Sequence, residues 1–409
     1  MGDNEQKMDT NVNKKTREIP NVPNLRFSSS ILDWELKPIT TLIEECSETT
    51  SNFEKYPLYS FTIEDGVVPK SERYERSFLV KKDGDSFKVV KYNNFVMNPM
   101  NLRFGAISYS KVKNDVSVSG YYNIFNIDNA QCNDYWEALF RRTKTLKLYD
   151  SVATGSLLEK KRVHFSQFRS LKFYIPEYNE RIKISLFFSK INERIDTQSK
   201  IIEDLELVKK GISNTVFGDE SVVKKSWKTI KLSTILKERK TYDIKESIYP
   251  HATLSKEGIS AKTDRFNRDF LVKDEEKEYK VTHLNDICYN PANLKFGVIC
   301  LNTFGDAIFS PIYVTYEIDK KCDPYFISLY LTNPTFIGHI RKYEQGTVYE
   351  RMAVSSEDFL KGEINLPTYE EQLKIAKTFK SIDEKIAIEQ AILNKLKEQK
   401  KFLLSNMFI

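Results

Sequence analysis

The sequence predicts an α+β protein made of two similar domains, separated by two long helices that form an antiparallel coiled coil. Two observations lead to this prediction: the 409-residue chain contains one unit twice, and each copy ends in a long segment with a heptad pattern. A duplicated unit of this kind is expected to fold with pseudo-two-fold symmetry. The length agrees, because chains beyond about 250–300 residues usually divide into several domains.

The duplication has a spacing of about 191 residues. Residues 98–105 read NPMNLRFG and residues 290–297 read NPANLKFG, so the two segments differ at only two positions. Further matches keep the same order along the chain: Trp34 with Trp227, residues 78–81 with 270–273, residues 175–176 with 366–367, and residues 216–217 with 407–408. Two copies are too few for a solenoid, which needs at least about three repeats. We therefore predict a pseudo-symmetric pair of domains.

Each copy opens with a globular stretch in which short apolar runs alternate with Asn, Asp, Gly and Pro. Such runs are typical of short strands, and we predict strands at residues 89–90, 95–97, 106–109, 298–301 and 312–316. Helical turns are expected at residues 135–142 and 325–331. The mixture indicates α+β domains.

Each copy then ends in a segment with the pattern of a long helix. Residues 177–217 contain no proline and one glycine, Gly211. Apolar residues recur at steps of four and three, from Ile184 to Val216 in the first copy and from Ile375 to Met407 in the second. A stripe with this period over more than about four heptads is typical of a coiled coil.

The alternative is that each helix is amphipathic and packs only on its own domain. Forty residues of helix rise about 60 Å, which exceeds the width of a domain of this size, so the two helices are expected to pair. Because two-fold symmetry relates the copies, the pairing is predicted to be antiparallel. Gln198 and Glu389 occupy seam positions near mid-helix, and we expect them to approach one another and fix the register.

These patterns divide the chain into five segments. The predicted boundaries are 1–26 for a polar N-terminal tail, 27–176 for the first domain, 177–217 for the first helix, 218–367 for the second domain and 368–409 for the second helix.

Bulk composition restricts the class of protein. No stretch of about 18 apolar residues predicts a membrane span. The five cysteines are scattered and never form a CxxC pair, which is typical of a reduced, cytoplasmic protein without zinc. The net charge of +6 permits a polyanionic partner without requiring one.

Cations and amides that recur in both copies are the candidate contacts to DNA. Cations bind phosphates, and Asn and Arg make paired hydrogen bonds to adenine and guanine edges. Residues 139–172 hold nine cations against two acidic residues, which suits a surface that faces phosphates. The predicted DNA-binding residues are Lys70, Arg73, Arg76, Lys88, Asn101, Arg103 and Arg162 in the first copy, with Lys262, Arg265, Arg268, Lys280, Asn293, Lys295 and Arg351 in the second.

Each of these residues also has a simpler interpretation. The cations are also found on solvated surfaces, and Asn-Pro segments are good turn formers. Residues 250–350 hold twelve cations and fourteen acidic residues, so the second domain needs a suitable arrangement of charge, rather than net charge, to bind DNA.

The chain resembles the specificity subunits of type I restriction-modification systems over nearly its whole length. The resemblance lies in the doubled architecture and in short motifs: residues 24–27 (NLRF) followed by Trp34, residues 290–297, and the domain-to-helix junction at Gly346, Arg351, residues 364–367 (INLP) and residues 370–372 (EEQ). The first copy is looser at this junction, with Gly155, Arg162, residues 175–176 and residues 179–181 (NER).

This resemblance implies a function in phage defence and DNA methylation. Each globular unit would be a target-recognition domain that reads half of a split site in double-stranded DNA. The helices would set the gap and dock two adenine methyltransferase subunits, and restriction subunits with translocase activity would join the complex. S-adenosylmethionine, ATP and Mg²⁺ would bind those partners, so no cofactor, metal or catalytic residue is expected in this chain. Because the two readers are similar, the target is expected to be close to palindromic.

Other classes of protein lack their expected features. Asn98 and Asn290 each precede one proline, but the second proline and the aromatic residue of an adenine methyltransferase motif are missing. The four histidines have no metal-binding spacing. A pseudo-dimeric DNA-binding regulator should carry a helix-turn-helix, which we do not find; that regulator and a scaffold protein without DNA binding remain the alternatives.

Overall fold

A computed structural model describes residues 21–28, 32–70, 87–156, 161–218, 226–244, 248–262, 278–346 and 352–409. The chain forms two compact units. Unit 1 contains residues 1–198 and 392–409, and unit 2 contains residues 199–391. This division passes through both long helices, whereas the predicted segments kept each helix whole.

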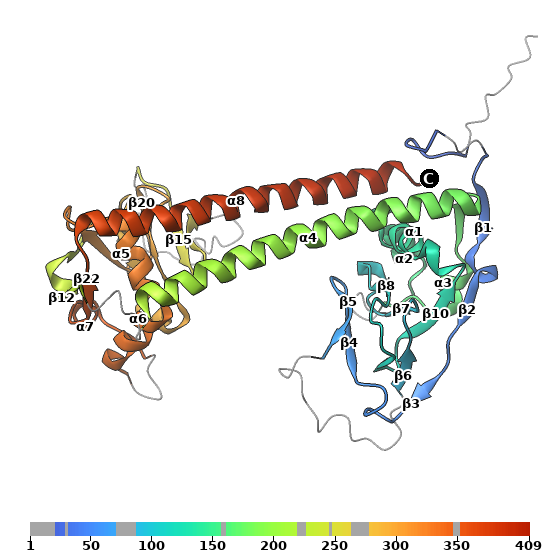
Figure 1. Cartoon of the computed structure of the whole chain (residues 1–409), viewed down its shortest axis with the longest axis horizontal. Helices are drawn as coiled ribbons and strands as arrows, with labels where there is room; N and C mark the ends of the chain where they lie inside the picture. Colours follow the sequence, from blue (N-terminus) through green and yellow to red (C-terminus); the bar gives the residue numbers. More distant parts are fainter. Residues whose placement is uncertain are drawn as a thin grey trace, which may run out of the picture. The chain divides into compact units, whose positions relative to one another are not determined.

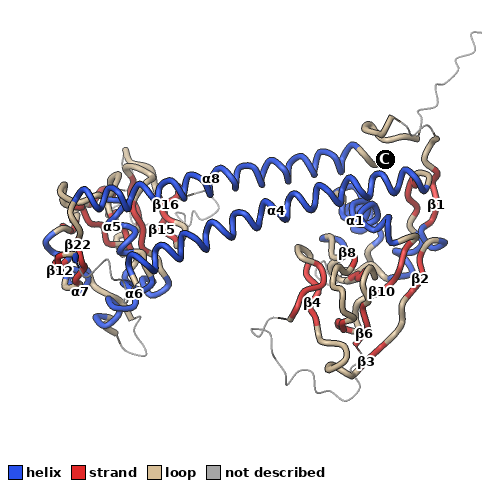
Figure 2. The backbone as a smooth tube through the Cα atoms, viewed as in Figure 1, coloured by secondary structure: helices blue, strands red, loops and turns tan. Residues whose placement is uncertain are grey.

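Unit 1 is built from antiparallel sheets (Figures 1 and 2). Its largest sheet has the order β2 (Ile43–Glu45), β10 (Asn123–Ile127), β7 (Phe95–Met97) and β8 (Ile107–Tyr109). A second sheet has the order β3 (Thr49–Thr50), β6 (Phe87–Val90) and β9 (Val116–Ser119). Two-stranded pairs are formed by β4 (Tyr59–Thr62) with β5 (Gly66–Pro69), and by β1 (Glu35–Pro38) with β11 (Lys172–Ile175).

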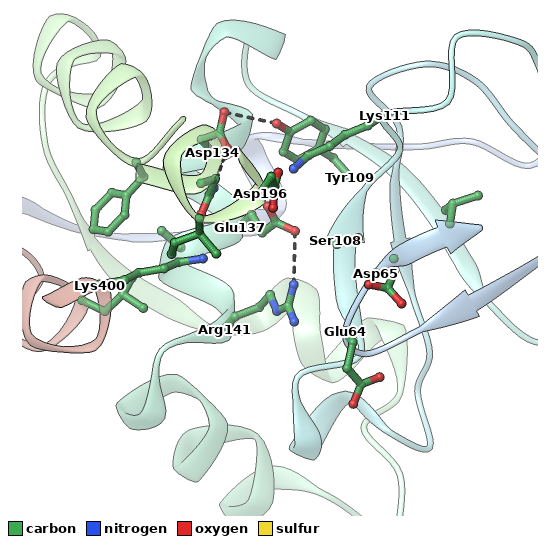
Figure 3. Close-up of a pocket in the computed structure, with 17 residues that line it drawn as sticks. Glu64, Asp65, Ser108, Tyr109, Lys111, Asp134, Glu137, Arg141, Asp196 and Lys400 are labelled. Carbon is green, nitrogen blue, oxygen red and sulfur yellow. Dashed lines mark hydrogen bonds and ion pairs between the residues drawn. The ribbon is translucent and has the colours of Figure 1, made fainter. Parts of the chain in front are cut away.

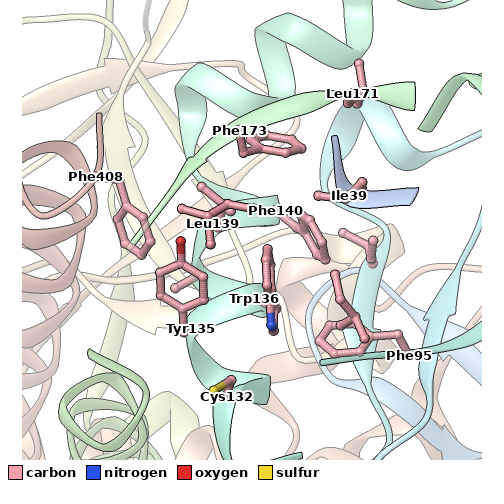
Figure 4. Close-up of a cluster of buried hydrophobic side chains, with 14 of the residues drawn as sticks. Ile39, Phe95, Cys132, Tyr135, Trp136, Leu139, Phe140, Leu171, Phe173 and Phe408 are labelled. Atoms are coloured by element: carbon pink, nitrogen blue, oxygen red, sulfur yellow. The ribbon is translucent and has the colours of Figure 1, made fainter. Parts of the chain in front are cut away.

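Three short helices complete unit 1: α1 (Asn133–Arg141), α2 (Thr143–Val152) and α3 (Phe165–Ser170). The core is rich in aromatic residues, because α1 places Tyr135, Trp136 and Phe140 on its buried face at helical spacing. Figure 4 shows Phe140 between Phe95 and Phe173, with Phe408 closing the cluster from the end of the chain.

Unit 2 repeats this architecture strand for strand. The four-stranded sheet has the order β13 (Leu236–Glu238), β21 (Val314–Ile318), β18 (Ile287–Tyr289) and β19 (Ile299–Leu301), and the three-stranded sheet has the order β14 (Tyr242–Asp243), β17 (Tyr279–Thr282) and β20 (Ala307–Phe309). The pairs are β15 (Ala252–Ser255) with β16 (Gly258–Ala261), and β12 (Lys228–Lys231) with β22 (Glu363–Leu366). The helices are α5 (Pro324–Leu331), α6 (Pro334–Ile340) and α7 (Ser356–Leu360).

Each described strand of unit 1 therefore has a counterpart in unit 2 whose label is higher by eleven, so that β1 corresponds to β12 and β11 to β22. A shared strand order is independent of the sequence matches, because it depends on contacts between distant residues. The predicted α+β duplication is confirmed. The predicted strand at 312–316 lies slightly too early, since β21 spans Val314–Ile318.

A long helix follows each domain: α4 (Tyr178–Phe217) has 40 residues and α8 (Tyr369–Asn406) has 38. In unit 1 the ring of Phe188 in α4 lies 5.8 Å from that of Phe408, just beyond α8. In unit 2 the Phe217 ring at the end of α4 lies 6.1 Å from that of Phe379, near the start of α8. In unit 2 the ion pair of Lys209 with Asp383 lies earlier along α4 and later along α8 than this ring contact, so the two helix segments run antiparallel, as predicted. In unit 1 the attraction between Asp196 of α4 and Lys400 of α8 gives the same direction.

The burial pattern follows the predicted seam. Every predicted seam position in both helices is buried or half-buried, and the residues between them are mostly exposed. The polar seam residues Gln198 and Glu389 are 9% and 7% exposed. Their mutual approach stays a prediction.

Candidate nucleic-acid interface

The matched Asn-Pro segments form the same loop in both units. The loop at residues 98–105 follows β7, and its ends are joined by a 3.0 Å hydrogen bond from Asn98 N to Ala106 O. The Val163 N–H donates to Pro99 O at 3.0 Å, which ties the loop to the segment before α3. The equivalent bonds in unit 2 are Asn290 N to Val298 O (3.0 Å) and Val354 N to Pro291 O (3.2 Å).

Glycine ends this loop in both units. Gly105 has φ 91° and Gly297 has φ 80°, a left-handed conformation that disfavours side chains. The turn leaves Asn101 and Asn293 exposed. Asn98 and Asn290 instead use their side-chain oxygens inside the turn, accepting from Met100 N and Ala292 N. The first Asn of each segment is therefore the turn former, and the second presents its amide to solvent.

The third matched position of the loop differs between the units. Arg103 donates to Asp150 of α2 at 2.7 Å, and this hydrogen bond holds the pKa of the Asp150 carboxyl below its usual value. Lys295 is exposed and lies over the ring of Phe296, 5.2 Å from its centroid. The guanidinium of unit 1 has a partner in its own domain, whereas the ammonium of unit 2 faces solvent.

Strand register corrects one of the sequence matches. Arg162 forms an isolated bridge with Thr154, and the equivalent bridge in unit 2 joins Gln345 and Ala353. The counterpart of the exposed Arg162 is therefore Ala353 rather than Arg351. Arg351 itself lies outside the described residues, as do Arg73, Arg76, Arg265 and Arg268.

The remaining matched lysines lie in the smaller strand groups. Lys70 and Lys262 are half-buried and follow the second strand of equivalent hairpins, and Lys88 is half-buried in β6. Lys280 in β17 is only 2% exposed, and its ammonium donates to Glu238 at 3.1 Å and lies over the Tyr242 ring. This burial argues against a direct contact between Lys280 and DNA, because its charge is already paired inside unit 2.

A polar network that the sequence did not reveal connects each domain to the long helices. In unit 1, Asp134 of α1 accepts from Asn192 of α4 at 3.2 Å and from the Tyr109 hydroxyl at 3.1 Å (Figure 3). In unit 2, Tyr325 of α5 donates to Asp383 of α8, which also pairs with Lys209 of α4 at 2.5 Å. The signal in the sequence was weak, since different residue types make equivalent contacts.

The network of unit 1 borders a cavity of about 380 Å³. Glu137 projects into it and pairs with Arg141 at 3.4 Å, and Lys400 of α8 lines the same cavity (Figure 3). Burial raises the pKa of the Glu137 carboxyl, and the attraction of Arg141 and Lys400 only partly opposes this. Burial also lowers the pKa of the Lys400 ammonium.

The raised pKa of Glu137 gives a pH-dependent stability. The Glu137 carboxyl binds a proton more tightly in the folded protein than in the unfolded chain. Above the folded pKa the ionised carboxylate therefore lowers the free energy of unfolding, and this cost disappears as the pH falls and the carboxyl is protonated. Glu137→Gln is expected to raise the thermal midpoint at pH 8, with the gain fading toward about pH 4, where the carboxyl is protonated in both states. Thermal unfolding of the variant and the wild-type chain between about pH 4 and pH 8 measures this difference in midpoint. Glu64→Gln, at an exposed residue of the same cavity, is the control; an equal gain at all pH values would contradict the assignment.

Two features of the described residues concern metal binding and thiol reactivity. Among them, no group of three or more His, Cys, Asp or Glu side chains is placed to hold a metal ion. Burial raises the pKa of the thiols, to about 11 for Cys132, Cys300 and Cys322, so these groups are protonated and weakly nucleophilic at neutral pH. No helix in the described ranges is both long and apolar enough to cross a membrane.

Comparisons with known proteins agree with this architecture. Residues 225–398 match the family described as the type I restriction modification DNA specificity domain. The putative type I restriction enzyme MjaX specificity subunit of Methanocaldococcus jannaschii is 23% identical over 282 residues, which cover 65% of this chain and 65% of that relative. The matched region thus spans slightly less than two thirds of the relative's length.

Solved structures share the fold over almost the whole chain. The S subunit of a type I restriction-modification system from M. genitalium has a TM-score of 0.58 at 14% identity, covering 95% of this chain and 99% of its own. A chain from a structural study of complex assembly and conformational transition in the type I system has a TM-score of 0.52 at 13% identity, covering 92% and 97%. Identities this low show the fold alone.

Fold and comparisons together define the class: a tandem pair of α+β domains, each followed by a long helix, as in solved S subunits. Within this class, residues 225–398 match the family described as the type I restriction modification DNA specificity domain, and the chain is similar to the putative MjaX specificity subunit. The resemblance drawn from the sequence motifs is confirmed.

Proposed function

We propose that this chain is the DNA-specificity subunit of a type I restriction-modification complex and reads a bipartite target through its two domains. The observation that carries this proposal is the exact repetition of strand order, with the same exposed Asn after the same Asn-Pro turn in each unit. Two equivalent readers in one chain suit two related half-sites. The family match in residues 225–398 supports DNA as the ligand.

Within each domain, the proposed contacts divide into two kinds. Asn101 and Asn293 have the chemistry to read adenine edges, because an exposed amide can donate and accept at once. Arg162, Lys295, Lys70 and Lys262 are the proposed contacts to phosphates, which position the protein without reading sequence. These roles are proposals for both units.

The long helices are the proposed docking surface for two adenine methyltransferase subunits. Large apolar side chains lie exposed away from the seam, including Leu186 and Leu207 in α4 and Ile388 and Phe402 in α8, each more than half exposed. Such residues at intervals along a helix favour a further protein partner. Restriction subunits with translocase activity would join through this assembly. S-adenosylmethionine, ATP and Mg²⁺ would bind the partners, which would perform the chemistry.

Methylome sequencing after co-expression with the adenine methyltransferase that the proposal requires as a partner tests the proposal. We expect a split adenine-methylated target with two related halves. Asn293→Ala should relax or abolish recognition of one half and Asn101→Ala that of the other, because losing a paired contact to a base costs about 1–3 kcal/mol. Each variant is the matched control of the other. A continuous target, or two wholly unrelated halves read by such similar domains, would contradict the proposal.

A further inference from the structure

A cationic cavity of about 700 Å³ lies in unit 1, where the start of α2 meets the end of α8. Five cations line it: Arg141, Arg142, Lys144, Lys147 and Lys401. No Asp or Glu is among the described residues of its wall. This concentration of one charge in a hollow is unusual, because the chain as a whole is close to balanced, with 63 Lys and Arg against 57 Asp and Glu.

The two arginines are held in place from inside the unit. Arg142 is 9% exposed, donates to Ile409 O at 2.5 Å, and lies over the Phe408 ring, 5.5 Å from its centroid. Arg141 donates to Ile63 O at 2.5 Å. Arg142 therefore holds a fixed positive charge in the wall, whereas the charge of Arg141 is partly balanced by Glu137 at 3.4 Å.

The three lysines are different. Lys144, Lys147 and Lys401 are exposed, and within the described part of the chain none of them has an ion-pair partner. These ammonium groups share the cavity wall with the buried Arg142 guanidinium and the half-buried Arg141 guanidinium, and like charges repel one another. A bound anion would offset that repulsion.

Unit 2 provides an internal comparison. By the strand and helix equivalence, the counterparts of the five cations are Thr332, Asn333, Thr335, Gly338 and Lys210, of which only the last is charged. Asn333 caps α6 by accepting from Thr335 N at 2.9 Å and donates to Ser213 at 3.0 Å. In unit 1 the equivalent Arg142 gives α2 no side-chain cap. In unit 2 these positions thus carry one charge and Asn333 is held by hydrogen bonds, whereas in unit 1 all five positions are cations that line one cavity.

We propose that this cavity binds a phosphate of the DNA backbone, a contact that only the first domain makes; the proposal rests on the DNA-binding function proposed above. Lysine ammonium groups act as point charges toward phosphate oxygens, and the uncapped backbone N–H groups at the start of α2 add donors on the same wall. The contact is independent of base sequence, so it adds affinity without altering the target.

The test uses the full chain with the triple substitution K144Q/K147Q/K401Q. Fluorescence anisotropy with a target duplex over a range of salt concentrations gives the slope of log affinity against log salt. Each lost phosphate contact is expected to lower the magnitude of that slope by about 0.9, with weaker binding at low salt and unchanged preference between target and non-target duplexes. The matched control K190Q/K210Q/K395Q removes three exposed helix lysines elsewhere and should keep a steeper slope than the cavity variant.

The outcomes separate the site from the function. If the wild-type chain binds the target and both triple variants keep its slope, the cavity site is wrong and the DNA-binding function stands. If the wild-type chain binds no duplex, the proposed function fails, and so does DNA as the occupant. Calorimetry with inorganic pyrophosphate covers a free phosphate ligand: pyrophosphate binding lost in the cavity variant, with DNA binding intact, would overturn the backbone contact. If the cavity variant loses binding to the methyltransferase while its DNA binding is unchanged, the backbone contact is likewise wrong. The cavity would then bind an acidic surface of that protein.

Discussion

Removing one heptad from each long helix is expected to shorten the gap in the DNA target by about 3 base pairs. Seven residues of helix span about 10.5 Å, and base pairs rise about 3.4 Å along the duplex axis. Residues 198–204 of α4 and 389–395 of α8 are matched by the duplication, and their removal keeps the steps of four and three along the seam. Methylome sequencing of cells that express the shortened chain with its methyltransferase measures the gap directly.

Removing the heptad from α4 alone is the control for this experiment. A deletion in one helix shifts its seam residues past those of the other, so modification is expected to fall at every target. A double deletion that leaves the original gap unchanged would show that the helices do not determine the spacing. The proposed function would then lose its account of how the two half-sites are kept apart.

Phe140→Ala is expected to destabilise unit 1 by about 3–5 kcal/mol, the usual cost of truncating a buried aromatic residue. Phe140 is 0% exposed, and its ring contacts Phe95, Trp136 and Phe168 at centroid distances of 5.9, 5.7 and 5.3 Å. Denaturant unfolding followed by circular dichroism measures the loss. Because the chain has two compact units, two transitions are expected, and only that of unit 1 should move.

The duplication supplies the matched control. Leu331 is the counterpart of Phe140 and is also 0% exposed, so Leu331→Ala should shift the transition of unit 2 by about 2–5 kcal/mol and leave that of unit 1 in place. Tyr121→Ala, at a side chain that is 88% exposed, should change neither. A shift of both transitions by Phe140→Ala would mean that the two units unfold together.

Periodicity and repetition explain why much of the fold could be predicted. The heptad steps from Ile184 to Val216 are a local pattern, and the two copies reinforce one another wherever short motifs recur. The order of strands in each sheet depends on pairing between distant residues and could not be predicted from a single sequence. The slip at β21 arose because the apolar run begins before the strand does.

The candidate site was predicted less well, for two physical reasons. The sequence predicts a surface position for Lys280, but β17 is the central strand of its sheet and all four of its residues are buried. The strand therefore lacks the alternation of polar and apolar residues that would mark its buried face. Residue type matches Arg162 with Arg351, whereas the equivalent backbone bridges, Thr154 with Arg162 and Gln345 with Ala353, make Ala353 its counterpart. The network around Asp134 needed three segments to meet in space, and no local pattern encodes that.

The ribbons β1–β11 and β12–β22 have a consequence for modularity. Glu35 lies beside Ile175, and Lys228 lies beside Leu366, so the chain enters and leaves each domain at neighbouring points. A domain whose two ends meet in this way is a cassette: it can be exchanged for another with the same ribbon while the following helix continues unchanged. If each domain reads a half-site as proposed, new preferences can arise by swapping whole cassettes, without the many small adjustments that reshaping one domain in place requires.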